Sequence, residues 1–259
     1  MRRILAITLP LILAFGCSQS DQPRSTTPAT DDVTQRQSDD PLIRDFTDSE
    51  WERVHRCADA LERQPQKAIP LLIRLLDRDE IVKLQNTADL IYPGAETFYG
   101  HGWIINYDLD WLSVRAGWLL EEITFQDFGF SEHGIDHDNL LSAAVAGKRD
   151  VPLGDVAEID SDPTQRIQRR SEAVARAKAW WRLNHPHWTR LSALSNALRS
   201  ENSYCVLNAL SWLRHGESPI DGFSHDLYVK DIYPVVQRLA KSQDDEIASQ
   251  AGYLISEKR

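Results

Sequence analysis

The stretch AIPLLIRLLDRDE, residues 68–80, decides the fold class, because its apolar residues recur at the three- and four-residue spacing of one helix face. We expect a helix that begins near Ala68 and tolerates Pro70 in its first turn. Such a helix is apolar along one side only. It therefore has to bury that side against other helices.

The same periodicity runs through most of residues 42–259, whereas strand-like alternation is almost absent. Upstream, Asp48-Ser49 is expected to cap a helix that carries Trp51, Val54, Ala58 and Leu61 on its apolar face. The other expected helices span 110–125, 164–184, 187–200, 202–214, 230–241 and 244–257. The sequence therefore predicts an all-α domain.

Three segments resemble the helices of HEAT-type repeats. Residues 68–80 resemble the second helix of such a repeat, and DLDWLSVRAGWLLEEI at 108–123 resembles the first helix of the next. The matching positions in the latter are Asp110, Val114, Arg115 and Ala116. In the third match, residues 234–255, Ile247-Ala248 stands where Val-Arg is expected.

The resemblance implies a short, irregular α-solenoid, or α-α superhelix, whose repeats stack into one continuous core. Long insertions separate the matching segments, and the most aromatic of them is the Tyr92–Trp111 insertion. Arg115 is expected to have a structural role, bonding a turn Asp or the carbonyl groups of a neighbouring repeat. A helical bundle without repeats is the alternative.

The N-terminus has the features of an export signal. Met1-Arg2-Arg3 is basic, and the apolar run Ile4 to Phe15 is too short to cross a bilayer but suits a secretory peptide. With Gly16-Cys17 at its end the segment resembles a bacterial lipoprotein signal, although its Leu lies one place further from Cys17 than usual. An ordinary secreted protein is the alternative.

This resemblance implies that residues 1–16 are removed and that Cys17 becomes the acylated, membrane-attached N-terminus. Ser18 stands where an Asp would indicate retention at the inner membrane, so the resemblance favours the outer membrane, facing the periplasm. Residues 18–41 contain no large aromatic residue, Leu or Ile and are expected to be a disordered tether, with a reach of roughly 25–30 Å. The predicted organisation is a signal peptide at 1–16, a lipidated Cys and tether at 17–41, and a helical domain at 42–259.

Charge and cysteine content narrow the range of functions. The formal net charge of −10, which becomes −12 once Arg2 and Arg3 leave with the signal, argues against nucleic-acid binding. Beyond Cys17, only Cys57 and Cys205 remain, and each fits the apolar face of an expected helix. Buried free thiols are favoured over a disulfide between them.

The segment from 92 to 130 holds 10 of the chain's 22 aromatic residues. These rings either pack inside the domain or, together with Glu96, Asp108 and Asp110, form a surface for a peptide, a sugar or a cationic group. Internal packing is favoured for the segment as a whole. If the segment binds a partner, the predicted contact residues are Tyr99, Trp103 and Tyr107.

A second polar constellation, Glu132-His133-Gly134-Ile135-Asp136-His137-Asp138, has two His residues four apart with a carboxylate between them. With His101, His185 or His187 it could ligate a metal, but a solvated loop is the favoured interpretation. The chain lacks a phosphate-binding Gly loop, a nucleophile elbow and a dinucleotide fingerprint. No catalytic residue, metal site or cofactor is assigned.

The sequence therefore favours a non-enzymatic, lipid-anchored protein that faces the periplasm and binds or scaffolds another protein. The alternative is a metal-dependent hydrolase that acts on cell-envelope material through residues 132–138 and His101. An immunity or inhibitor protein would be a special case of partner binding. The partner, pathway and oligomeric state are not indicated.

Overall fold

The computed structural model describes residues 41–88, 90–95, 103–131, 163–216 and 218–257. Across these ranges the chain is mostly helical, which confirms the all-α prediction. The helices are α2 (Pro41–Phe46), α3 (Trp51–Glu62), α4 (Pro65–Leu75), α5 (Leu112–Thr124), α7 (Pro163–Asn184), α8 (Arg190–Ala197), α9 (Ser203–His215), α10 (His225–Leu227), η2 (Tyr228–Ile232), α11 (Tyr233–Leu239) and α12 (Asp245–Glu257).

Helices α3 and α4 form with small differences from the expected boundaries. The N-cap of α3 is Glu50, and Asp48 instead accepts the Glu50 N–H at 3.0 Å in the turn before the helix. Helix α4 begins at Pro65 rather than near Ala68, because a proline in the first helical position loses no hydrogen bond. Pro70 therefore lies inside the helix and not in its first turn, which corrects the prediction.

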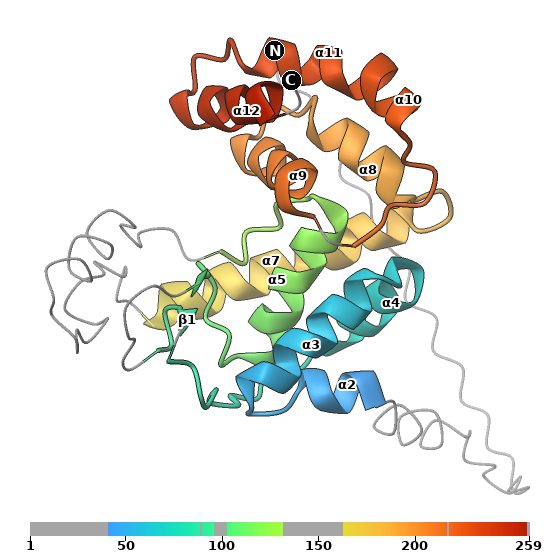
Figure 1. Cartoon of the computed structure of the whole chain (residues 1–259). Helices are drawn as coiled ribbons and strands as arrows, with labels where there is room; N and C mark the ends of the chain where they lie inside the picture. Colours follow the sequence, from blue (N-terminus) through green and yellow to red (C-terminus); the bar gives the residue numbers. More distant parts are fainter. Residues whose placement is uncertain (1–40, 89, 96–102, 132–162, 217, 258–259) are drawn as a thin grey trace, which may run out of the picture. The chain divides into compact units, whose positions relative to one another are not determined.

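Helix α5 is the centre of the domain. It contacts α3 and α4 on one side and α7 and α8 on others, and Figure 1 shows it between the α2–α4 group and the α8–α12 group. Almost all of its residues are buried, including Arg115 and Glu121. A helix buried on every side needs internal partners for its polar groups, and these shape the site described below.

The predicted role of Arg115 is confirmed in the main. Its side chain is fully buried, and its three guanidinium nitrogens donate hydrogen bonds of 2.8–3.0 Å to the carbonyl groups of Leu109, Phe46, Asp48 and Val82. These carbonyls belong to three separate segments of chain. One cation thus holds the turns before α3 and α5 and the loop after α4 together.

The C-terminal helices pack on α9, which contacts both α8 and α12. Thr189 caps α8 by accepting the Ser192 N–H, so the helix begins at Arg190, later than the expected 187. Between α10 and α11 the chain makes a π-helical turn, in which Tyr233 donates its N–H to the carbonyl of Tyr228. Pro234 follows and has no N–H with which to restore regular α-helical bonding at that point.

Two strands that the sequence did not predict lie in the aromatic insertion. β1 (Leu90–Ile91) and β2 (Trp103–Ile104) pair in parallel, with Leu90 opposite Trp103 and Ile91 opposite Ile104. At two residues each, they are too short to show alternation. Their effect is to place Trp103 beside α3.

The two cysteines of the helical domain, Cys57 and Cys205, are buried free thiols, as predicted. Cys57 donates through its sulfur to the carbonyl of Leu42. None of the helices in the described ranges combines the length and apolar character that crossing a bilayer requires.

Candidate functional site

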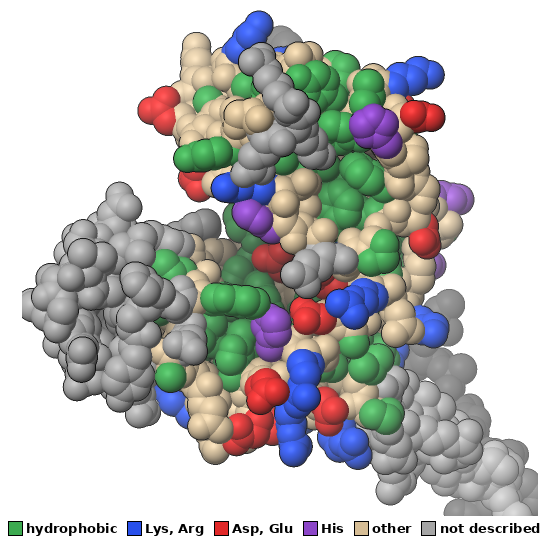
Figure 2. Space-filling view, viewed as in Figure 1, with side chains coloured by type: hydrophobic (Ala, Val, Ile, Leu, Met, Phe, Trp, Pro, Cys, Tyr) green, Lys and Arg blue, Asp and Glu red, His purple; other side chains and the backbone are tan. Residues whose placement is uncertain are grey.

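A hollow with mixed chemistry, here named the central cleft, lies between α3, β2, α5 and α9 and has a volume of about 750 Å³. Figure 2 shows acidic, histidine and hydrophobic side chains meeting in the hollow at the middle of this face. Helix α3 supplies His55, Asp59 and Glu62, and α5 supplies Trp118 and Glu122. The remaining walls include Trp103, Arg190, Asn208, Trp212 and His215.

One wall of the central cleft is a bonded network around Arg190, whose side chain is only 3% exposed. Its Nη1 donates to Ser218 Oγ at 2.8 Å and to the carbonyl of Glu62 at 3.1 Å. Ser218 Oγ in turn donates to Glu62 Oε2 at 2.6 Å, and Arg190 Nη2 lies 3.7 Å from the same oxygen. The network fixes Glu62 and leaves Arg190 Nε without a hydrogen-bond partner within the described ranges.

Glu122 is the carboxyl group in the cleft with the most altered acidity. Burial and the nearby charge of Glu62 raise its pKa to about 7, against the opposing effects of Arg190 and the Trp118 side chain. A carboxyl group with this pKa can both hold and release a proton at neutral pH. Its charge is therefore not fully compensated by the residues around it.

Glu121, the neighbour of Glu122 in α5, is fully buried and belongs to the interior. Burial raises its pKa to about 8, even though Glu121 accepts the Tyr107 hydroxyl and the N–H groups of Phe128 and Phe130. The hydroxyl groups of Tyr107 and Tyr204 also contact each other. This polar cluster joins α5 to α9 and has a structural role.

Aromatic rings line the cleft entrance. The rings of Trp103 and His55 lie 4.6 Å apart between centroids, and Trp51 lies 5.5 Å from His55 and 6.3 Å from Trp118. Trp103 is 59% exposed, which is unusual for so large an apolar side chain. Such a ring can stack on an apolar or cationic group that enters the cleft.

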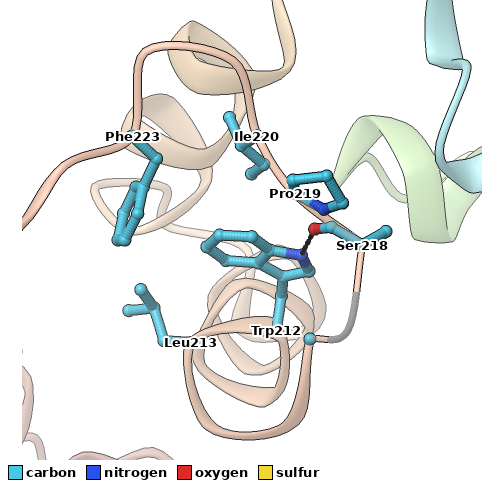
Figure 3. Close-up of a pocket in the computed structure, with 7 residues that line it drawn as sticks. Trp212, Leu213, Ser218, Pro219, Ile220 and Phe223 are labelled. Carbon is cyan, nitrogen blue, oxygen red and sulfur yellow. Dashed lines mark hydrogen bonds between the residues drawn. The ribbon is translucent and has the colours of Figure 1, made fainter.

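Trp212 separates the central cleft from a second hollow of about 310 Å³, here named the Trp212 pocket. Figure 3 shows its indole ring surrounded by Leu213, Pro219, Ile220 and Phe223, and its Nε1 donates to the Ser218 carbonyl at 3.3 Å. The hydrogen bond orients the ring. Trp212 is thus a wall shared by the two hollows.

A third hollow of about 510 Å³, the Tyr228 pocket, shares Phe223 with the Trp212 pocket. The π-helical turn presents Tyr228 and Val229 to it, and α11 adds Tyr233. Ring centroids follow one another at 5.2, 6.4 and 6.0 Å from Trp212 through Phe223 and Tyr228 to Tyr233. We name these three hollows together the aromatic groove.

The three predicted contact residues differ in their placement. Trp103 lies at the surface in the central cleft, where a contact residue is expected. Tyr107 is 4% exposed and bonded to Glu121, so it packs inside the domain because its hydroxyl has a buried carboxyl partner. Tyr99 and Glu96 lie outside the described residues.

Asp108 and Asp110, considered above as surface groups, are buried. Asp108 pairs with Arg166 of α7 at 2.8 Å, and Asp110 accepts the Leu84 N–H and the Tyr92 hydroxyl, each at 2.9 Å. A Cβ on Gly94 would come within 2.7 Å of both carboxylates, so this glycine admits the close approach. Both acids therefore hold the insertion in place.

The possible metal ligands at 132–138 and His101 also lie outside the described residues, and metal binding there stays the alternative hypothesis to a solvated loop. His185 and His187 are exposed at the end of α7. Within the described ranges, no group of three His, Cys, Asp or Glu side chains is arranged to hold a metal ion.

Several groove residues carried no signal in the sequence. Glu62 and Glu122 read as ordinary helix positions, and only the folding of α3, α5 and α8 brings them together with Arg190. Phe223, His225, Tyr228 and Val229 of the Tyr228 pocket precede the expected helix at 230–241 and were assigned no role. No protein-family model matches the chain, and no curated protein or solved structure matches it.

Proposed function

We propose that the protein is a lipid-anchored binding protein of the bacterial periplasm, and that its aromatic groove holds an extended segment of a partner protein. Cys17 is the proposed acylated residue, and the outer membrane is the proposed location. The helical domain is proposed to be a short, irregular HEAT-like superhelix. Its role is non-enzymatic, as a binding or scaffold module.

The observation that carries this proposal is the series of three adjacent hollows lined by aromatic rings, with an exposed apolar side chain at each end. Trp103 marks the central cleft, and Val229, which is 51% exposed, marks the Tyr228 pocket. Aromatic side chains are enriched where protein surfaces meet and often contribute most of the binding energy. A chain of hollows suits a linear segment better than a single small molecule.

The arrangement of helices supports the superhelix. Helices next to one another in the chain contact each other, as in α2–α3, α3–α4, α4–α5, α8–α9 and α11–α12. This is the pattern expected when neighbouring units stack. Arg115, at the position that resembles the repeat family's Arg, bonds to the carbonyl groups of preceding segments.

The test is capture of partners from cells by a tagged protein carrying Trp103→Ala and Val229→Ser. Both side chains are exposed, so this groove variant should stay folded and lose the bound partner. The matched control is Ile167→Ala with Leu183→Ala, which removes two exposed apolar side chains from α7, away from the groove. Equal capture by the groove variant and the control would refute the proposal.

A further inference from the structure

The walls of the central cleft contain more acidic than basic groups. Asp59, Glu62 and Glu122 contribute carboxyl groups, and Arg190 is the one Lys or Arg residue among its described lining residues. Arg190 already bonds to the carbonyl and the carboxylate of Glu62 and to Ser218. The positive charge of Arg190 is therefore largely compensated by these groups of the cleft wall.

Glu122 and Asp59 remain with little cationic compensation. The raised pKa of Glu122 has burial and the charge of Glu62 as its largest causes. Asp59 lies 3.9 Å from His55 Nδ1, and this contact is an ion pair only when the imidazole is protonated. A cation entering the cleft would lower the electrostatic cost of ionising Glu122.

The aromatic rings of the cleft also match a cationic side chain. The exposed ring of Trp103 and the half-buried ring of Trp118 line the cleft together with the carboxyl groups of Asp59 and Glu122. A Lys or Arg side chain can be held by carboxylates and aromatic rings at the same time.

We propose that the central cleft is a subsite for a Lys or Arg side chain, held between the carboxylates of Glu122 and Asp59 and the rings of Trp103 and Trp118. This inference rests on the proposed function, because it assumes that the segment in the groove is a polypeptide. It predicts that the partner segment has a basic residue in the central cleft and apolar residues where the segment passes Trp212 and Phe223. The negative charge of the whole chain, −10, favours the approach of such a partner.

The test uses short leucine-flanked peptides that differ only at the central residue, which is lysine, arginine or norleucine. Binding is measured through the fluorescence of the tryptophan residues at physiological salt. The lysine and arginine peptides should bind about tenfold more tightly than the norleucine peptide, as expected for a charge-assisted contact. Spermidine and a chitin oligosaccharide serve as probes without a peptide backbone.

The variant Asp59→Asn with Glu122→Gln keeps the shape of the cleft and removes the two carboxylates that are not bonded to Arg190, so the preference for lysine and arginine should disappear. The matched control, Glu201→Gln with Asp221→Asn, removes two exposed carboxylates outside the cleft lining and should keep the preference. Circular dichroism of both variants confirms that each is folded.

Three outcomes would overturn the subsite. They are equal binding of the norleucine peptide, tighter binding of spermidine or the oligosaccharide than of the basic peptides, and an unchanged preference in the cleft variant. The proposed function is tested separately from the subsite. Partner capture by the Trp103→Ala, Val229→Ser variant does not depend on which residue is at the centre of a test peptide. A groove that still captures its partner without a lysine or arginine preference leaves the proposed function intact.

Discussion

Arg115 satisfies main-chain carbonyl groups from three segments at a position that excludes water. Burial lowers its pKa to about 10, and the guanidinium group stays charged at neutral pH. A lysine has the same charge, but its single ammonium group cannot reproduce the geometry of the planar fork. The role of Arg115 therefore depends on its shape as well as its charge.

Arg115→Lys should lower the free energy of unfolding by about 2–4 kcal/mol, because buried carbonyl groups lose their donors. Urea unfolding followed by circular dichroism measures the change. The control is Arg53→Lys, an exposed ion pair with Asp48, for which a change within about 0.5 kcal/mol is expected. A similar, small effect at both positions would show that Arg115 does not organise the fold.

Glu121 should make stability depend on pH. Its pKa is about 8 in the folded protein and near 4.5 when unfolded, so between these values the folded state binds more protons. Glu121 therefore gives its whole stabilising contribution to the free energy of unfolding below about pH 4.5. This stabilisation is lost as the pH rises to about 8. Glu121→Gln keeps a neutral, hydrogen-bonding side chain at every pH and so removes the pH dependence that Glu121 causes.

The predicted result is that the stability advantage of Glu121→Gln over the unmodified protein grows as pH rises through this window. Thermal or urea unfolding at a series of pH values measures it, with Glu201→Gln as the exposed-carboxyl control. Parallel stability curves for Glu121→Gln and the unmodified protein would mean that Glu121 is not protonated in the fold.

At this scale, sequence reasoning predicted some residue roles and not others. The structural role of Arg115 was expected from the resemblance of residues 108–123 to a HEAT-type helix, and the buried thiols were expected from helical periodicity. Tyr107 was predicted as a contact residue because aromatic composition does not show which rings have a buried partner. The partner of Tyr107 is Glu121, and the residue spacing of its helix does not reveal that this carboxyl group is buried.

Among the elements, α5 is packed so tightly that it requires a glycine. A Cβ on Gly117 would lie 2.3 Å from Phe130, whose ring is buried. Gly252 lies in α12, and a Cβ added there would meet no atom of the described residues within 4 Å. Substituting each glycine with alanine therefore distinguishes the effect of helix propensity on stability from the effect of packing.

Gly252→Ala should raise the free energy of unfolding by up to about 1 kcal/mol through helix propensity alone. Gly117→Ala gains the same propensity but forces Phe130 to move, so a net loss of about 1 kcal/mol or more is expected. Thermal unfolding of the two variants measures both changes. Stabilisation by Gly117→Ala would show that α5 and Phe130 are loosely packed.

The elements themselves were largely predictable, since amphipathic spacing extends over whole helices. The exceptions have local physical causes. Pro65 starts α4 early, Pro234 follows a π-helical turn, and β1 and β2 are too short for alternation to be visible. The aromatic groove was not predictable, because its walls come from β2, α3, α5, α9 and the π-helical turn.

At the scale of the whole molecule, the proposed anchor makes a separate prediction. Cys17→Ala should abolish incorporation of a labelled fatty acid and release the protein from the membrane fraction, because the acyl acceptor is gone. Cys205→Ala, which alters a buried thiol of the helical domain, should leave labelling unchanged. Labelling that persists in Cys17→Ala would refute the anchor.

The central claim is that the aromatic groove holds an extended segment of a partner protein. The most direct measurement places a photo-crosslinking amino acid at Trp103 or Val229 in the groove, and at Ile167 or Leu183 on α7 as controls, and maps the crosslinks formed in cells. The account predicts that one protein crosslinks at both groove positions through a single continuous segment that contains a Lys or Arg, and not at the controls. Crosslinks to unrelated proteins at the two groove positions, or equal crosslinking at the control positions, would contradict it.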